Sequence, residues 1–264
     1  MLNKVLMCIL SFNRQPFLKR CIETFLPYTS EPVDLIIVDN GSKEPTLNFL
    51  KKLEDKKLAN GTNIKIIYNP YNFGIPKALN QALALRDPSQ HFFKLDNDMI
   101  GDVNYPRWLT DMIECIELSP YNDNVKIIGL SPFKEGRYWK KHVYLTNGKA
   151  FEVEDPDPNT ILGPGHLIHK DVFLKIPNYD ERGFLYGYDD TNFFLKAKKL
   201  GFKSVYHFRC KAVHGDDLSL LESSEHTNYK NLQLQGRKDL KNYDSTEYSE
   251  DNSELKIVFE QGEI

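Results

Sequence analysis

The chain has 264 residues, 41% hydrophobic and 27% charged, which is the balance of an ordinary globular protein and a size that suits one α/β domain better than two. Its net charge of −3, from 34 Lys and Arg against 37 Asp and Glu, argues against a general nucleic-acid binder. No segment approaches the roughly 18 uncharged apolar residues of a membrane span. The four scattered cysteines include no Cys-x-x-Cys pair, so we expect free thiols and a cytoplasmic protein.

Strand and helix patterns alternate through the first half of the chain. The apolar run near the N-terminus is followed by no small-residue cleavage site, so it predicts a strand rather than a secretion signal. Apolar runs predict strands, and apolar residues at helical spacing predict helices, over the following ranges: strands at 5–10, 33–38, 63–68 and 91–95, and helices at 16–26, 45–53 and 75–85. This order predicts a parallel sheet covered on both faces, with ligands at the carboxyl ends of its strands.

The second half predicts a mixture of antiparallel and irregular elements. We expect helices at 105–116 and 190–200, the latter closed by Gly201, and strands at 125–130, 138–145, 149–153 and 203–206. Asn147-Gly148 predicts a type I′ hairpin turn between two of these strands. The proline-rich and glycine-rich stretch 154–165 predicts a loop. Residues 221–264 hold 10 Asp and Glu against 5 Lys and Arg and indicate an acidic, polar extension.

A pair of carboxylates follows the fourth predicted strand, in Lys94-Leu95-Asp96-Asn97-Asp98. In an extended chain Asp96 and Asp98 project to the same side. Two carboxylates so placed repel each other unless a hard cation lies between them, which indicates a divalent metal with phosphate ligands. The plainer interpretation is a polar loop, in which Asp98 or Asp102 caps the next helix.

Further acidic and imidazole groups occur near the C-terminal end of the predicted domain. Asp189-Asp190 precedes a helical run, so these residues either favour the helix dipole or supply a general base whose basicity apolar neighbours raise. His214 follows a short strand. A single imidazole suits an oxygen-rich magnesium or manganese site, although a lone histidine is usually structural.

Two early loops lie at the expected ligand-binding edge. Ser11-Phe12-Asn13-Arg14 ends the first predicted strand, and Asp39-Asn40-Gly41-Ser42 ends the second. A buried Asp39 could accept a hydrogen bond from a pyrimidine imide, and Phe12 could pack on the base. Ordinary turn chemistry also explains Asx residues before glycine.

Taken together, these motifs resemble glycosyltransferase family 2, the nucleotide-sugar transferases of GT-A fold. The resemblance runs from about Leu6 to Asp217 through five motifs in order: CILSFNRQPFLKRCIETF…VDLIIVDNGSKEPT, NPYNFGIPKALNQAL with Asn72, Gly74 and Asn80, FFKLDNDM, YDERGFLYGYDDTNFFLKAKKLGF and VYHFRCKAVHGDD. It implies an α/β GT-A fold: a Rossmann-like, mostly parallel sheet with helices on both faces and a smaller antiparallel, acceptor-side region. The implied domain is 1–220, with a nucleotide-binding half at about 1–100 and an acceptor-binding half at about 101–220.

The resemblance implies a role for each matching position. Asp39 would read uracil or thymine, Asp98 and His214 would bind Mn²⁺ or Mg²⁺, and Asp96 would contact the ribose or the metal. The implied nucleotide-sugar pocket comprises Ser11, Phe12, Asn13, Arg14, Asp39, Asn72, Gly74, Lys77, Asp96 and Asn97. Asp190 would deprotonate an acceptor hydroxyl for inverting transfer from a nucleotide sugar, most simply a UDP-sugar.

The chain departs from the family pattern at two positions. Asp189-Asp190 replaces the usual Glu-Asp pair, so either aspartate could be the base, and Asn192 replaces a frequent acidic residue. Gly163 to His166 falls at an acceptor-side loop, where Gly165 and His166 could contact the sugar or the acceptor.

Other functions remain to be weighed. A sugar nucleotidyltransferase needs a glycine-rich loop after its first strand, and a dinucleotide oxidoreductase needs GxGxxG there; SFNRQPF provides neither. An Asp-x-Asp phosphatase would carry its motif after the first strand. A retaining transferase, or an inactive module that binds a sugar nucleotide or glycan, stays open. The sugar, the acceptor and the oligomeric state do not follow from the sequence.

Overall fold

The computed structural model describes residues 4–54, 56, 58, 60–120, 124–132, 139–155, 164–181, 189–215, 258–259 and 262–263. Its strands are β1 (Val5–Ser11), β2 (Asp34–Asp39), β3 (Asn63–Tyr68), β4 (His91–Leu95), β5 (Met99–Gly101), β6 (Val125–Pro132), β7 (Trp139–Tyr144), β8 (Ala150–Asp155), β9 (Gly165–Ile168), β10 (Lys203–His214), β11 (Val258–Phe259) and β12 (Gly262–Glu263). Its helices are α1 (Gln15–Phe25), α2 (Glu44–Leu53), α3 (Ile75–Leu83), α4 (Trp108–Leu118) and α5 (Asp189–Lys199), with a short 3₁₀ helix at Lys170–Leu174.

One mixed sheet organises these elements, in the order β3-β2-β1-β4-β9-β6-β10-β8-β7, with β5 paired to the end of β10. Strands β3, β2, β1 and β4 are parallel. Strand β9 is antiparallel to β4 on one side and to β6 on the other. The expected parallel first half and partly antiparallel second half are therefore confirmed.

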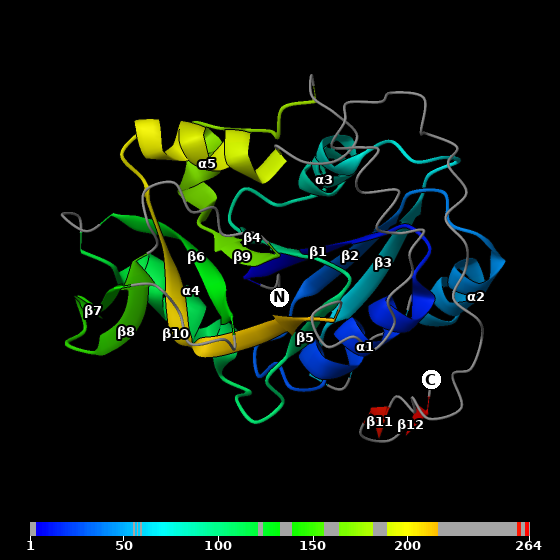
Figure 1. The fold of residues 1–264 in the computed structure, drawn as a ribbon, viewed down its shortest axis with the longest axis horizontal. Helices are drawn as coiled ribbons and strands as arrows, with labels where there is room; N and C mark the ends of the chain where they lie inside the picture. The colour runs from blue at the N-terminus through cyan, green and yellow to red at the C-terminus, as the bar shows by residue number, and fades with distance from the viewer. Residues whose placement is uncertain are drawn as a thin grey trace.

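Helices cover both faces of the sheet, as Figure 1 shows: α3 and α5 lie on one side, and α1 and α4 on the other. Side chains alternate along β1, so that Val5, Met7 and Ile9 join the core under α1, α2 and α4. Leu6 and Cys8 join the second core, under α3 and α5. Burial on both faces is the physical reason that these strands read as continuous apolar runs.

Several elements differ from the sequence expectation. Strands β3 and β4 match their predicted bounds. The helix expected at 105–116 begins at Trp108 and ends at Leu118. It begins late because two turns precede it: Tyr105 N donates a hydrogen bond to Asp102 O, and Trp108 N donates to Tyr105 O. Strand β10 continues eight residues past its predicted end, because β6, β8 and β5 pair with it in turn.

The β7–β8 hairpin is confirmed, but its predicted type I′ turn is wrong. A type I′ turn needs positive φ at both central residues. Gly148 has a positive φ of +83°, but Asn147 does not have a positive φ. Gly148 N instead donates to Leu145 O, and Leu145 N donates to Lys149 O, which indicates a type I turn followed by a left-handed glycine.

The loop expected at 154–165 is shorter than predicted at both ends. Strand β8 extends to Asp155, and Gly165 already begins β9, which pairs with two strands. Residues 156–163 lie outside the described residues, as does the extension expected at 221–264 apart from β11 and β12.

Candidate active site

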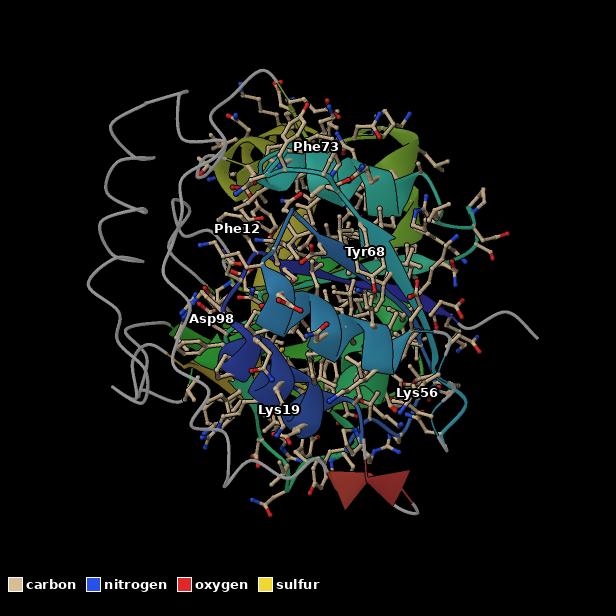
Figure 2. The ribbon with its side chains drawn as sticks, turned by 90° about the vertical axis from the view of Figure 1, so that its right-hand side faces the viewer. Phe12, Lys19, Lys56, Tyr68, Phe73 and Asp98 are labelled. Carbon is tan, nitrogen blue, oxygen red and sulfur yellow. The ribbon has the colours of Figure 1, made fainter. Side chains whose placement is uncertain are left out.

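The candidate site lies at the carboxyl ends of the parallel strands. Ser11 ends β1, Asp39 ends β2, and Asp96 to Asp98 follow β4. Figure 2 shows Phe12 and Asp98 on the same side of the molecule, although they come from different loops. The candidate residues therefore lie together at the sheet edge where ligands are expected to bind.

The loop after β1 is held in an unusual backbone conformation. Asn13 and Arg14 both have left-handed φ, at 53° and 58°. Asn13 N donates to Ser42 Oγ at 2.8 Å, and Lys43 N donates to Asn13 Oδ1 at 2.8 Å, so the loops after β1 and β2 are tied together. Left-handed conformations of non-glycine residues cost free energy and persist where surrounding contacts impose them, often at functional sites.

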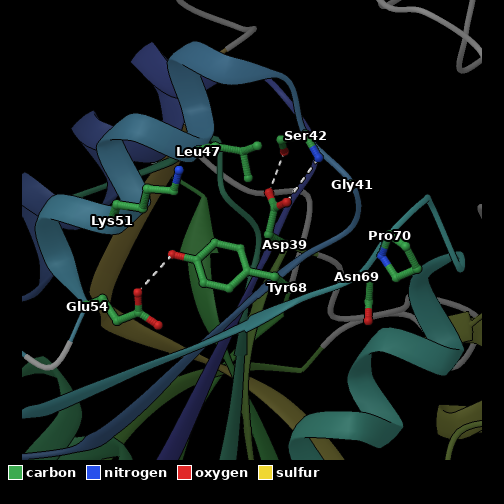
Figure 3. Close-up of a pocket in the computed structure, with 9 residues that line it drawn as sticks. All are labelled: Asp39, Gly41, Ser42, Leu47, Lys51, Glu54, Tyr68, Asn69 and Pro70. Atoms are coloured by element: carbon green, nitrogen blue, oxygen red, sulfur yellow. Dashed lines mark hydrogen bonds between the residues drawn. The ribbon is translucent and has the colours of Figure 1, made fainter.

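Asp39 is completely buried at the end of β2. Ser42 donates to its carboxylate from the backbone N at 3.0 Å and from the hydroxyl. Burial raises the pKa of Asp39, and the hydrogen bonds from Ser42, Ser11 and Gly41 oppose that shift. Asp39 also lines a cavity of about 370 Å³ with Leu47, Lys51, Glu54, Tyr68, Asn69 and others, which Figure 3 shows between α2 and the end of β3.

The loop between β3 and α3 closes beside Asp39. Asn72 Oδ1 accepts a hydrogen bond from Gly74 N at 2.8 Å, an Asx turn leading into α3. Gly41 has φ +81°, and a Cβ there would lie 2.6 Å from the Tyr71 Cα, so only glycine fits this approach. Lys77, expected in the nucleotide pocket, is exposed on α3, and its Nζ lies 4.1 Å from the centroid of the Phe73 ring.

Three candidate metal ligands converge as the sequence predicted. Asp96, Asp98 and His214 each offer a ligand atom, and these atoms lie within 4.8 Å of one another. His214 reaches this position because it pairs with Met99 across β10 and β5, which puts its Nδ1 3.5 Å from Asp98 Oδ2. Carboxylate oxygens with one imidazole fit Mg²⁺ or Mn²⁺. Asn97 is partly exposed between the two aspartates.

A buried arginine also contacts this cluster, which sequence reasoning placed only in the nucleotide pocket. Arg14 Nη1 lies 2.9 Å from Asp98 Oδ2, and each side chain is 5% exposed. The left-handed backbone at Arg14 directs its side chain across to the loop after β4. The guanidinium also lies 4.1 Å from the centroid of the Phe17 ring. Arg14 thus places a fixed positive charge beside the candidate metal carboxylates.

The second acidic pair lies at the first turn of α5 and contacts Lys94 from β4. Lys94 Nζ is 2.7 Å from Asp190 Oδ2 and 3.8 Å from Asp189 Oδ2. It is also 3.2 Å from Asp96 Oδ1, so one ammonium joins the two acidic groups. Sequence reasoning gave Lys94 no role. The sequence feature that could have indicated a role is the position of Lys94, a charged residue within the buried strand β4.

Asp190 lies in an environment that alters its acidity. Burial raises its pKa to about 8; the Lys94 ammonium opposes this shift, and the Asp189 and Asp96 carboxylates add to it. A carboxyl group with a pKa near working pH is suited to general base or acid chemistry. In the described part of the chain, Asp190 Oδ1 accepts no hydrogen bond.

Gly165 and His166 lie on β9 rather than on the loop that the sequence predicted, and His166 lies next to Asp190. His166 is fully buried and its Nε2 lies 4.0 Å from Asp190 Oδ1. A Cβ on Gly165 would lie 2.6 Å from Leu130 Cδ1, so a larger residue there would require the Leu130 side chain to move. Since β9 pairs with both neighbouring strands, this position is fixed by the sheet.

The comparisons with known proteins agree with this geometry. Residues 7–177 match the family model described as glycosyl transferase family 2. A curated relative from Haemophilus influenzae, described as an uncharacterized glycosyltransferase, is 26% identical over 78% of this chain and 62% of its own length.

Two solved structures have a similar fold at low sequence identity. The mannosyltransferase PcManGT from Pyrobaculum calidifontis, in complex with GDP-Man and Mn²⁺, has a TM-score of 0.61 at 12% identity, covering 89% of this chain and 62% of that chain. S. aureus TarS 1–349 in complex with UDP-GlcNAc has a TM-score of 0.56 at 16% identity, covering 88% and 65%. These similarities confirm the expected α/β GT-A fold.

The chain spans less than two thirds of the length of these three proteins. Within its described residues, no helix combines the length and apolar character needed to cross a bilayer.

Proposed function

The chain belongs to glycosyl transferase family 2, and from this membership we propose that it transfers a sugar from a nucleoside diphosphate to an acceptor hydroxyl. One observation carries the proposal beyond the family. The ligand atoms of Asp96, Asp98 and His214 converge within 4.8 Å, and Lys94 links Asp96 to the Asp190 carboxylate. A candidate donor site and a candidate base therefore lie side by side.

We place the nucleotide in the half formed by residues 1–100. Asp39 is the group that reads the base, since it is buried and fixed by Ser42 at the end of β2. Phe12 and Arg14 line the same edge of the sheet. UDP is the first donor nucleotide to test, and GDP the second, because TarS and PcManGT were solved with UDP-GlcNAc and GDP-Man respectively.

The diphosphate lies in our proposal beside Asp96, Asp98 and His214, which would hold Mn²⁺ or Mg²⁺. A bound divalent cation would supply positive charge to the leaving diphosphate. Arg14 adds a permanent positive charge 2.9 Å from Asp98. Because Arg14 and Asp98 are both buried, this charge acts with little screening by water.

Asp190 is the proposed general base, in the half formed by residues 101–220. Its carboxylate takes the proton of the acceptor hydroxyl while the hydroxyl oxygen bonds to the anomeric carbon. The bond from that carbon to the diphosphate oxygen breaks, and the electron pair leaves with the nucleotide. Attack opposite the leaving group inverts the anomeric configuration, so a product with retained configuration would contradict this assignment.

We expect two substitutions to separate donor binding from transfer. Asp98→Ala removes a candidate ligand and abolishes the Mn²⁺-dependent part of UDP binding. Asp190→Ala leaves UDP binding intact and lowers transfer by about 10²–10⁴-fold, the usual contribution of a general base. Calorimetric titration of UDP with and without Mn²⁺, followed by nucleotide-release assays with UDP-GlcNAc (UDP released) and GDP-mannose (GDP released), measures both effects.

The outcomes are distinct. Equal loss of UDP binding in the two variants would overturn the division of roles. Wild-type protein that binds UDP and Mn²⁺, yet releases no nucleotide from any donor sugar or acceptor offered, would favour an inactive binding module. No binding of UDP, GDP or dTDP under either condition would contradict the proposed donor site.

A further inference from the structure

Lys94 lies where the alternation of β4 requires an apolar side chain. It follows Phe92 on the face of β4 that packs beneath α3 and α5, while Phe93 and Leu95 face the other core. Its side chain is 4% exposed, and Lys94 is the only buried lysine among the described residues. Burying an ammonium group is costly unless it is paired, so its partners indicate why it is there.

Those partners come from two separate parts of the candidate site. On the α5 side, Lys94 Nζ is 2.7 Å from Asp190 Oδ2 and 3.8 Å from Asp189 Oδ2. On the donor side, the same nitrogen is 3.2 Å from Asp96 Oδ1. An ammonium group has three hydrogens to donate, so Lys94 can engage carboxylates from the loop after β4 and from α5 at once.

The two oxygens of the Asp190 carboxylate have different surroundings, and Oδ1 is buried. Oδ2 accepts from Lys94, while Oδ1 accepts no hydrogen bond in the described part of the chain and faces His166 Nε2 at 4.0 Å. Lys94 and His166 are paired residues of β4 and β9. The sheet therefore fixes the lysine, and the lysine fixes the orientation of the carboxylate.

We infer that Lys94 is a positioning residue for the transfer: it holds the Asp190 carboxylate in place at the first turn of α5 and ties it to Asp96 on the donor side. This inference rests on the proposed function. Without the ammonium, Asp96, Asp189 and Asp190 would repel one another at close range. Asp190 would then turn away from the position in which it can receive the acceptor proton.

The expected kinetic effect is specific to the reaction step. A displacement of about 1 Å in a catalytic group can lower a rate by about 100-fold. We expect Lys94→Met to lower kcat for UDP release by about that factor, with the donor KM changed less than about threefold. Lys94→Arg keeps the positive charge and should restore part of kcat.

Three comparisons test the inference. Lys126→Met removes a partly buried lysine of β6, whose Nζ lies 3.3 Å from Ile116 O, and serves as the control. Release of UDP from UDP-GlcNAc, or of GDP from GDP-mannose, is measured at saturating Mn²⁺ for wild type and each variant, after thermal unfolding has confirmed that each is folded. In the Asp190→Asn background, Lys94→Met should lower kcat no further than about twofold, because the group it positions is already absent.

A crystal structure of Lys94→Met supplies a readout that needs no turnover. We expect the Asp190 carboxylate to leave its wild-type position there and to keep it in Lys94→Arg. An unmoved Asp190 in Lys94→Met, or an equal loss of kcat with and without Asp190, would overturn the inference alone. Wild-type protein that neither binds UDP with Mn²⁺ nor releases nucleotide would instead overturn the proposed function, and this inference with it.

Discussion

Buried charges decide the chemistry of this site at the scale of single residues. Arg14 and Lys94 each pair with aspartates at positions with little access to water. A buried ion pair adds little net stability, because desolvating both charges offsets much of their attraction. We attribute these pairs to the orientation of Asp98 and Asp190, which in our proposal bind the donor and activate the acceptor.

Asp190 predicts a pH dependence of transfer. Burial raises its pKa to about 8, and a general base must be ionised to accept a proton. Transfer should therefore fall as the pH drops below about 8, and level off above it. Initial rates of transfer, measured below and above pH 8 at fixed saturating donor and Mn²⁺, test this pH dependence.

The control for this prediction is Asp190→Asn, whose residual transfer rate should not show the fall below about pH 8. UDP binding with Mn²⁺ measured across the same pH range separates a change in transfer from a change in donor affinity. A wild-type profile that stays flat through pH 8 would contradict the assignment of Asp190 as the base.

At the scale of elements, one asparagine joins the two halves of the domain. Asn80 on α3 accepts from Tyr179 N at 2.9 Å and donates to Tyr179 O at 3.0 Å. Its Nδ2 also lies 2.7 Å from Glu181 Oε1. Tyr179 is buried against the Phe193 ring of α5, so Asn80 fixes the described segment that ends at Glu181 and Tyr179 packs on that helix.

Asn80→Ala should loosen this connection. The backbone N–H and C=O of Tyr179 would lose their side-chain partner, which costs about 1–3 kcal/mol of unfolding free energy. Transfer should fall because α5 carries Asp190, while UDP binding should change little. Urea unfolding and calorimetry measure the two effects.

Asn63→Ala is the matched control, since Asn63 makes an exposed hydrogen bond to Asp34 at 2.9 Å. It should change stability by less than about 0.5 kcal/mol. If both variants unfolded at the same urea concentration as wild type, Asn80 would not be what holds Tyr179 in place.

At the scale of the whole molecule, the sheet brings together groups that are distant in sequence. The pairing of β5 with β10 carries His214 to Asp98, and β9 carries His166 to Lys94. These contacts connect residues from both halves of the expected 1–220 domain. A ligand that engages the assembled site should therefore stabilise the molecule as a unit.

UDP with Mn²⁺ should raise the thermal unfolding midpoint. A ligand at about 100 times its Kd contributes about 2.7 kcal/mol, which corresponds to roughly 5–10 °C in a domain of this size. Adding EDTA should remove most of the shift while UDP remains, because Asp96 and Asp98 repel the diphosphate unless a cation separates them. Scanning calorimetry of the wild type and Asp98→Ala provides the measurement.

In Asp98→Ala the same mixture should give little shift. An equal shift for UDP with and without EDTA would indicate that the positive charges of Arg14 and its neighbours hold the diphosphate without a metal.

The sequence by itself determined the layered α/β fold and most of the candidate site. The sequence identified β3 and β4 with their bounds. The edge strand β3 shows alternating burial, and β4 is buried throughout its length. Asp39, Asp96, Asp98 and Asp190 could be predicted because each stands at a strand end or a helix start, which is a local property of the chain.

Only the tertiary structure decided which charges meet. Strands β5 and β9 are three and four residues long, and they form because distant strands pair with them. The Arg14–Asp98 and Lys94–Asp190 contacts join residues 84 and 96 positions apart. No local pattern encodes such contacts, because the left-handed backbone at Arg14 and the register of β4 against β9 direct these side chains only after the sheet has assembled.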